Sequence, residues 1–189
     1  MSSSVVYHIA GNAMILTSMC MQYAYWTSLV GRIVRPAEMV GASLACLATY
    51  TFDRIVPSSD DTSSAFRRRN SDTSAKQALA AQVASFLIVS SFAPRLLLNA
   101  VMALPFGVIY STSLVPIKHL FIGSKNVYVT AMWVAWFFGA CGALPPRNSR
   151  ESLTIGLYAA HMLLSNVIMD VKDIEQDRRD CVPTVPSFL

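Results

Sequence analysis

Six long stretches of the chain are almost purely apolar, and short polar segments separate them. A segment that crosses a bilayer forms a helix of roughly 17–25 mostly apolar residues, because the hydrocarbon offers no partner for unpaired backbone groups. The pattern therefore predicts an all-α, polytopic transmembrane helix bundle of about six spans. The expected spans are about 5–29, 37–55, 76–93, 96–117, 127–144 and 151–169.

Composition supports this interpretation. Hydrophobic residues make up 53% of the 189 residues and charged residues only 14%, whereas about 25% is usual in soluble domains. The first span has no basic segment before it and is longer than the apolar part of a signal peptide, about 7–15 residues, so we expect a retained anchor. The four cysteines form no metal-binding spacing and are expected to be small packing residues.

Alternating spans place the segments after spans two, four and six on one face of the membrane. That face carries ten of the fifteen lysines and arginines, which predicts that it is cytoplasmic. It also carries nine of the eleven acidic residues. Acidic residues contribute little to membrane orientation, so the rule that retains basic loops does not explain this second bias.

Carboxylates gather at the ends of two apolar stretches. Asp53 ends the second span, and Asp170, Asp173 and Asp177 follow the sixth at offsets of three and seven residues, which share one face of a helix. Unpaired acids at a membrane boundary are costly and suggest function, and hard oxygens with phosphate suit Mg²⁺. The expected magnesium ligands are Asp53, Asp60, Asp61, Asp170, Asp173 and Asp177, and the expected phosphate-binding residues are Arg54, Lys118, Lys125 and Lys172.

Solvated loop charges are the alternative interpretation, since surface ion pairs contribute only about 0–1 kcal/mol. Two acidic helix ends and a basic loop on one face favour a cation-and-phosphate site instead. The arginine run "FRRRN" at 66–70 is expected to fix topology or to contact lipid headgroups. We expect membrane lipid as a partner, and no nucleic acid.

The second acidic segment resembles a motif of the UbiA superfamily of intramembrane prenyltransferases, and the likeness runs from the first span to "TVP". The family pattern is D-x-x-D-x-x-x-D, then basic residues and T-x-P. The segment "YSTSLVPIKHL" resembles the family's tyrosine-to-lysine segment. The resemblance implies a prenyl diphosphate held through Mg²⁺, and catalytic roles for Asp53, Asp173, Tyr110 and Lys118. The second motif is matched by Asp170, Asp173, Asp177, Arg178, Arg179, Thr184 and Pro186.

The first motif departs from the family pattern. Thr49 stands where asparagine is expected, Asp53 is retained, and Pro57 replaces the next aspartate, which leaves Asp60 or Asp61 as the later acid. The family fold also has more helices than six. We therefore expect residues 1–189 to form a single UbiA-like membrane domain without the last helices, either as a fragment or closed by a partner such as a second copy.

The resemblance implies ionisation of an isoprenoid diphosphate, followed by transfer of the prenyl group to an aromatic or lipid acceptor. One alternative is a membrane terpene cyclase that acts on farnesyl or geranylgeranyl diphosphate. Another is an inactive, shortened relative with a binding or structural role. Tyr50, Tyr110, Trp133 and Trp136 are expected to line a cavity for the carbocation or to pack in the bundle.

Overall fold

The computed structural model describes residues 3–56, 73–112, 115–179 and 181–188, and within these ranges every element is a helix. For residues 3–11, Arg54 and Lys172, among others, it describes the backbone but not the side chain. The elements are α1 (Ser3–Leu29), α2 (Pro36–Ile55), α4 (Thr73–Ser90), α5 (Pro94–Thr112), η1 (Ile117–His119), α6 (Ser124–Ala140), α7 (Ser149–Asp170), η2 (Val171–Asp173), α8 (Ile174–Arg179) and α9 (Val185–Phe188).

The six long helices coincide with the six predicted stretches to within a few residues. Prolines set both ends of α2, because Pro36 occupies its first turn and Pro57 follows the extended residue Val56. The side chain of Asn148 caps α7 by accepting a hydrogen bond from the Glu151 amide at 2.9 Å. Local chemistry thus explains where these two helices begin or end.

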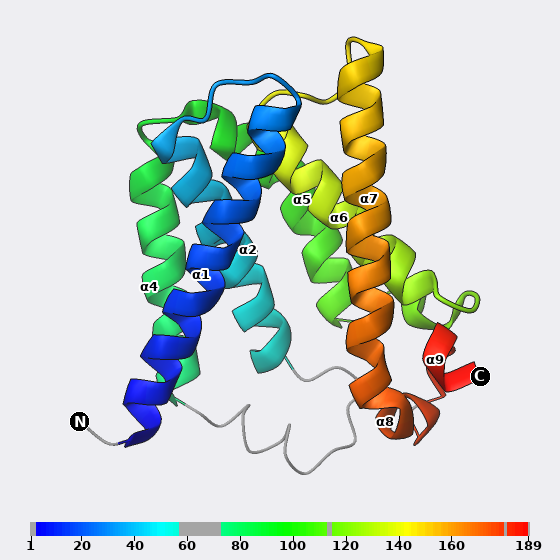
Figure 1. Ribbon diagram of the computed structural model, residues 1–189. Helices are drawn as coiled ribbons and strands as arrows, with labels where there is room; N and C mark the ends of the chain where they lie inside the picture. The colour runs from blue at the N-terminus through cyan, green and yellow to red at the C-terminus, as the bar shows by residue number, and fades with distance from the viewer. Residues whose placement is uncertain (1–2, 57–72, 113–114, 180, 189) are drawn as a thin grey trace.

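The long helices alternate in direction, so the C-terminal ends of α2, α5 and α7 lie at the same end of the molecule as the start of α6 (Figure 1). This arrangement agrees with the alternation deduced from the apolar pattern. At the opposite end, Arg32 after α1 pairs with Glu151 of α7 at 2.6 Å. The backbone amide of Arg147 donates to the second oxygen of Glu151 at 2.7 Å.

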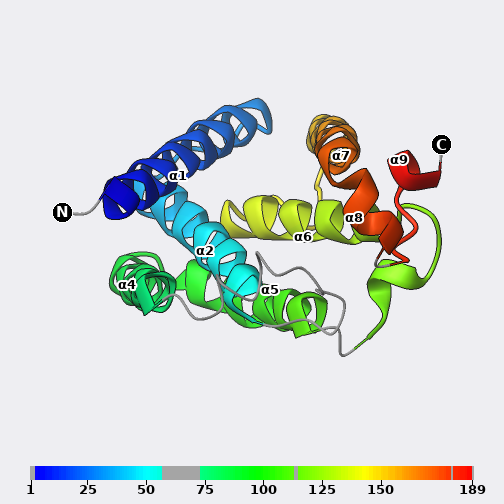
Figure 2. The same cartoon turned by 90° about the horizontal axis from the view of Figure 1, so that it is seen from below.

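α2 lies at the centre of the bundle and contacts α1, α4, α5 and α6, whereas α7 packs mainly against α6 (Figure 2). Close packing against α2 requires small residues. A Cβ at Gly41 would collide with Leu96 of α5, and Ala42 and Ser43 beside it are fully buried.

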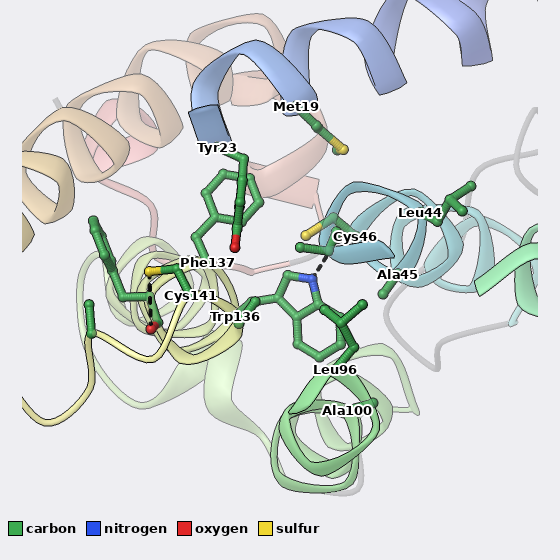
Figure 3. Packing of buried hydrophobic residues seen from close by; sticks show 14 of the residues in the cluster. Met19, Tyr23, Leu44, Ala45, Cys46, Leu96, Ala100, Trp136, Phe137 and Cys141 are labelled. Carbon is green, nitrogen blue, oxygen red and sulfur yellow. Dashed lines mark hydrogen bonds between the residues drawn. The ribbon is translucent and has the colours of Figure 1, made fainter. Parts of the chain in front are cut away.

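The core is built around Trp136 and Phe137 of α6 (Figure 3). The Trp136 indole donates to the Ala42 carbonyl oxygen of α2 at 2.8 Å, and Phe137 meets Tyr23 of α1 edge to face at 5.7 Å. Trp136 is therefore a packing residue. Trp133 likewise packs edge to face on Phe137 at 5.4 Å.

Among the described residues, α5 and α7 are long and apolar enough to cross a membrane, and residues 75–90 form a shorter apolar helix. Only 25% of the apolar window of α5 and 17% of that of α7 is buried within the described part of the chain. The exposed apolar side chains of α7 are Leu153, Leu157, Leu163, Leu164, Ile168 and Met169.

The four cysteines are free. Cys46 and Cys141 are buried in the core, as expected for packing residues. Cys181 is exposed and has a positive φ of 53°, so the packing interpretation is wrong for this residue. It lies in the turn between α8 and α9, outside the apolar stretches.

Gly41→Ala should destabilise the bundle by about 1–3 kcal/mol, because the added methyl group enters the space of Leu96. Gly156→Ala is the matched control: it lies in α7 with nothing within 4 Å of the added Cβ, so it should be neutral or stabilising by up to about 1 kcal/mol. Thermal unfolding of the purified variants in detergent measures both changes in stability. Equal melting temperatures for the two variants would contradict the tight contact at Gly41.

Candidate functional site

The acidic segment after α7 is not one continuous helix. Asp170 ends α7, the 3₁₀ turn η2 contains Asp173, and α8 carries Asp177. The regular α-helix assumed for these three aspartates is therefore wrong, because the 3₁₀ turn η2 interrupts it between Asp170 and Ile174. Figure 1 shows α8 turned away from the axis of α7. Two of the carboxylates nevertheless meet at the same lysine.

Lys125, in the first turn of α6, bridges the two acids. Its ammonium nitrogen lies 2.9 Å from Asp170 Oδ1 and 3.7 Å from Asp177 Oδ1. The side chain of Lys125 is 22% exposed, and those of Asp170 and Asp177 are 8% and 10% exposed. The bridge is therefore largely withdrawn from solvent, where breaking an ion pair is far more costly than at the surface.

The second oxygen of each carboxylate has a neutral donor. The side-chain amide of Asn126 donates to Asp170 Oδ2 at 2.8 Å, and the Thr184 hydroxyl donates to Asp177 Oδ2 at 3.1 Å. Asn126 is 1% exposed and Thr184 is completely buried. Both carboxylates are thus fixed in orientation by residues that carry no charge.

The segment after α8 folds back to hold Thr184 in place. The Val182 amide donates to the Asp177 carbonyl oxygen at 2.8 Å, and the Gly123 amide donates to the Pro183 carbonyl oxygen at 2.8 Å. Gly123 precedes α6 with a φ of +79°, a conformation that favours glycine. These bonds tie α8 to the start of α6.

Burial and charge act in opposite directions on the ionisable groups of the bridge. Burial alone would lower the pKa of the Lys125 ammonium, but the nearby carboxylates, above all Asp170, outweigh it and raise that pKa above its ordinary value. Burial raises the pKa of the Asp177 carboxyl, although Lys125 and Thr184 act against it. Asp173 is half-buried and adds negative charge to both groups. Lys125 therefore stays protonated at neutral pH.

An aromatic pair lies at the same end of the bundle. The rings of Tyr110 and Tyr128 stack at 5.7 Å with an interplanar angle of 10°, and the Lys118 ammonium lies 5.0 Å from the centre of the Tyr110 ring. The carboxylates of Asp53, Asp170 and Asp177 all act electrostatically on the Tyr110 hydroxyl. This tyrosine thus lies within electrostatic range of both the end of α2 and the acidic segment after α7.

An apolar groove of about 460 Å³ runs between α6 and α7. Val127 and Thr130 line it, and Thr130 is one helical turn beyond Asn126. Farther along, Val134 and Leu163 also line the groove. The charged end of the bundle and the apolar groove are therefore adjacent along α6.

The structure brings most of the expected site residues to one end of the bundle. Asp60 and Asp61 lie outside the described residues, as do the side chains of Arg54 and Lys172. Tyr50 is 41% exposed at the end of α2. The expected residues that do gather at this end are Asp53, Tyr110, Lys118, Lys125, Asp170, Asp173 and Asp177.

Asn126 is the site residue that the sequence reasoning missed. The expected site residues were charged side chains such as its neighbour Lys125, and asparagine carries no charge. Its position could have identified it. Asn126 directly precedes the apolar stretch at 127–144 and is a polar residue in the first turn of a helix. A polar residue at such a position needs a partner when it is buried.

The described residues contain no group of three or more His, Cys, Asp or Glu side chains arranged to hold a metal ion. The chemistry of the donors still fits Mg²⁺, which typically uses one or two carboxylates plus phosphate oxygens from a substrate. Asp170 and Asp177 could supply the carboxylates. Asn126 adds a buried oxygen atom, Oδ1, for which the described part of the chain offers no hydrogen-bond partner.

Asn126→Leu should destabilise the protein by about 1.5–3 kcal/mol, because the buried Asp170 carboxylate loses a charge-assisted hydrogen bond. Asn166→Leu is the control, since Asn166 is half-buried in α7 and donates only to the neutral Thr130 hydroxyl at 3.2 Å. Melting temperatures in detergent should fall clearly more for the first variant. A larger loss for Asn166→Leu would contradict the importance of the Asp170 contact.

Comparisons with protein-family models, with curated proteins and with solved structures find no match for this chain. The likeness to a prenyltransferase family therefore depends on the motif residues themselves.

Proposed function

We propose that the chain is an Mg²⁺-dependent, multi-pass membrane enzyme of the UbiA type that ionises an isoprenoid diphosphate and transfers the prenyl group to an acceptor. One observation supports this most strongly. The acidic motif after α7, the lysine of α6 and the tyrosine of α5 meet at one end of an apolar bundle.

The proposed topology has six spans, with the charged end at the cytoplasmic face. The apolar, largely exposed surfaces of α5 and α7 support a lipid environment. The alternation of helix directions supports a common side for the ends of α2, α5 and α7 (Figure 1). The excess of lysine and arginine on that side supports its cytoplasmic orientation.

The ligand that fits this arrangement is amphipathic. A diphosphate would contact Lys125 and Lys118, whose ammonium groups supply positive charge at the end of the bundle. The hydrocarbon chain would lie in the apolar groove between α6 and α7, which begins beside the first turn of α6. Prenyl diphosphates combine these two parts in one molecule.

In the proposed reaction, the bond between the prenyl carbon and the diphosphate oxygen breaks, and the electron pair leaves with pyrophosphate. Mg²⁺, when bound, would supply Lewis-acid neutralisation of that leaving group. Lys118 and Lys125 stabilise the developing negative charge, and the stacked rings of Tyr110 and Tyr128 offer π-faces to the allylic cation.

A second candidate is a membrane protein that binds diphosphates without turnover. The observation in its favour is that Lys125 already neutralises both Asp170 and Asp177, as it would in a purely structural ion pair. Incubation of the purified protein with labelled farnesyl and geranylgeranyl diphosphate separates the candidates. A prenylated aromatic or lipid product identifies the transferase, a cyclised hydrocarbon or alcohol identifies a cyclase, and unchanged substrate identifies the binding protein.

Asp173→Asn should reduce Mg²⁺-dependent pyrophosphate release from a prenyl diphosphate by at least about 100-fold, because a carboxylate near Lys125 that would help to hold Mg²⁺ is lost. Glu175→Gln is the control in the neighbouring helix α8, where Glu175 is exposed and pairs with Arg179 at 3.3 Å. The control should retain wild-type release. An active Asp173→Asn enzyme would remove this residue from the proposed site.

The proposed orientation predicts that Cys181 reacts with a membrane-impermeant maleimide only after cells are opened, because this exposed cysteine is next to the acidic end. A cysteine at the exposed position Arg147, in a Cys181→Ser background, should react in intact cells. Labelling is read by mass shift on a gel. Reaction of Cys181 in intact cells would contradict the proposed orientation and place the acidic end outside the cytoplasm.

A further inference from the structure

The ammonium of Lys125 lies where a divalent cation would be expected, between two carboxylates from different elements. One oxygen of each carboxylate faces Lys125, at 2.9 Å for Asp170 and 3.7 Å for Asp177. The other oxygen of each is held by a neutral donor. Metal and lysine therefore compete for the same pair of oxygens.

Asn126 adds an unsatisfied acceptor next to the bridge. Its side chain is almost completely buried, and its Oδ1 atom has no hydrogen-bond partner among the described residues, although Nδ2 is bonded to Asp170. The orientation of this amide is fixed, since a carboxylate oxygen accepts only from the NH₂ group. A buried acceptor without a partner is costly, so a ligand that supplies a positive charge or a donor would relieve it.

We propose that Lys125 is an internal counter-ion that occupies the cation position until a diphosphate draws its side chain away, so that divalent metal and diphosphate bind cooperatively. This inference rests on the proposed function in that it assumes a diphosphate ligand at the same site. Lysine suits the role because its charge is compact and its four-carbon stem is flexible.

The coupling follows from the charges at the site. Metal alone must displace Lys125 and leave a buried ammonium without its carboxylates, which opposes binding. Diphosphate offers the ammonium a new anionic partner, and the metal then bridges the freed carboxylates to the phosphate oxygens. Because linkage is reciprocal, metal must favour diphosphate by the same factor by which diphosphate favours metal.

The test uses Mn²⁺ as a probe and the purified full chain in detergent, with bound metal measured by electron paramagnetic resonance. Wild-type protein should bind Mn²⁺ weakly. Lys125→Met should bind it about tenfold more tightly or better without any diphosphate, a factor typical of coupled sites. Lys125→Arg keeps the charge and should bind as weakly as wild type. Lys118→Met removes an equal charge over the Tyr110 ring and should not increase the Mn²⁺ affinity.

The double variant Lys125→Met/Asp170→Asn should lose the gain in Mn²⁺ affinity, which would locate the metal at Asp170. No gain for Lys125→Met would overturn the inference. Where this variant does not remain folded, Lys125→Gln serves in its place. In wild type, Mn²⁺ and inorganic pyrophosphate together should raise the melting temperature by more than the sum of their separate effects, and a merely additive rise would also overturn the inference.

The two proposals fail in different experiments. If Lys125→Met binds Mn²⁺ more tightly but wild type releases no pyrophosphate from prenyl diphosphates, the counter-ion role is supported and the proposed enzymatic function is refuted. If wild type releases pyrophosphate but Lys125→Met binds Mn²⁺ no more tightly than wild type, only the counter-ion role is refuted.

Discussion

The bridge from Asp170 through Lys125 to Asp177 is the interaction on which the charged end of this bundle depends. It joins the last residue of α7, the first turn of α6 and the short helix α8 in one contact. Asn126 and Thr184 then fix the remaining oxygens. Without the lysine, two buried carboxylates would lie close together with no positive charge between them, which is costly.

The helices were predictable because their physical cause is local. Long apolar stretches, prolines at both ends of α2 and an asparagine cap on α7 are all visible in the sequence. The number of membrane spans is a different matter, since only α5 and α7 carry a clear signal of length and hydropathy within the described residues. The central helix α2 includes Glu38 and Asp53, and these charges weaken its own signal.

The site was predictable in part. Spacing identified Asp170 and Asp177, and alternation of the helices brought Lys125 and Tyr110 to the same end. The turn η2 was not foreseeable from offsets of three and seven, because those offsets assume a regular α-helix. Asn126 was missed because the importance of a neutral amide depends on a partner 44 residues away, a contact that only the folded chain reveals.

The internal ammonium also has a consequence for biogenesis. Small metal-dependent domains such as zinc fingers stay unfolded until the ion arrives, because their ligands repel one another without it. Here the chain carries its own cation in the form of Lys125, which already contacts both carboxylates. The acidic end can therefore assemble as soon as α6 and α7 pack together, with no need for an ion to hold its carboxylates in place.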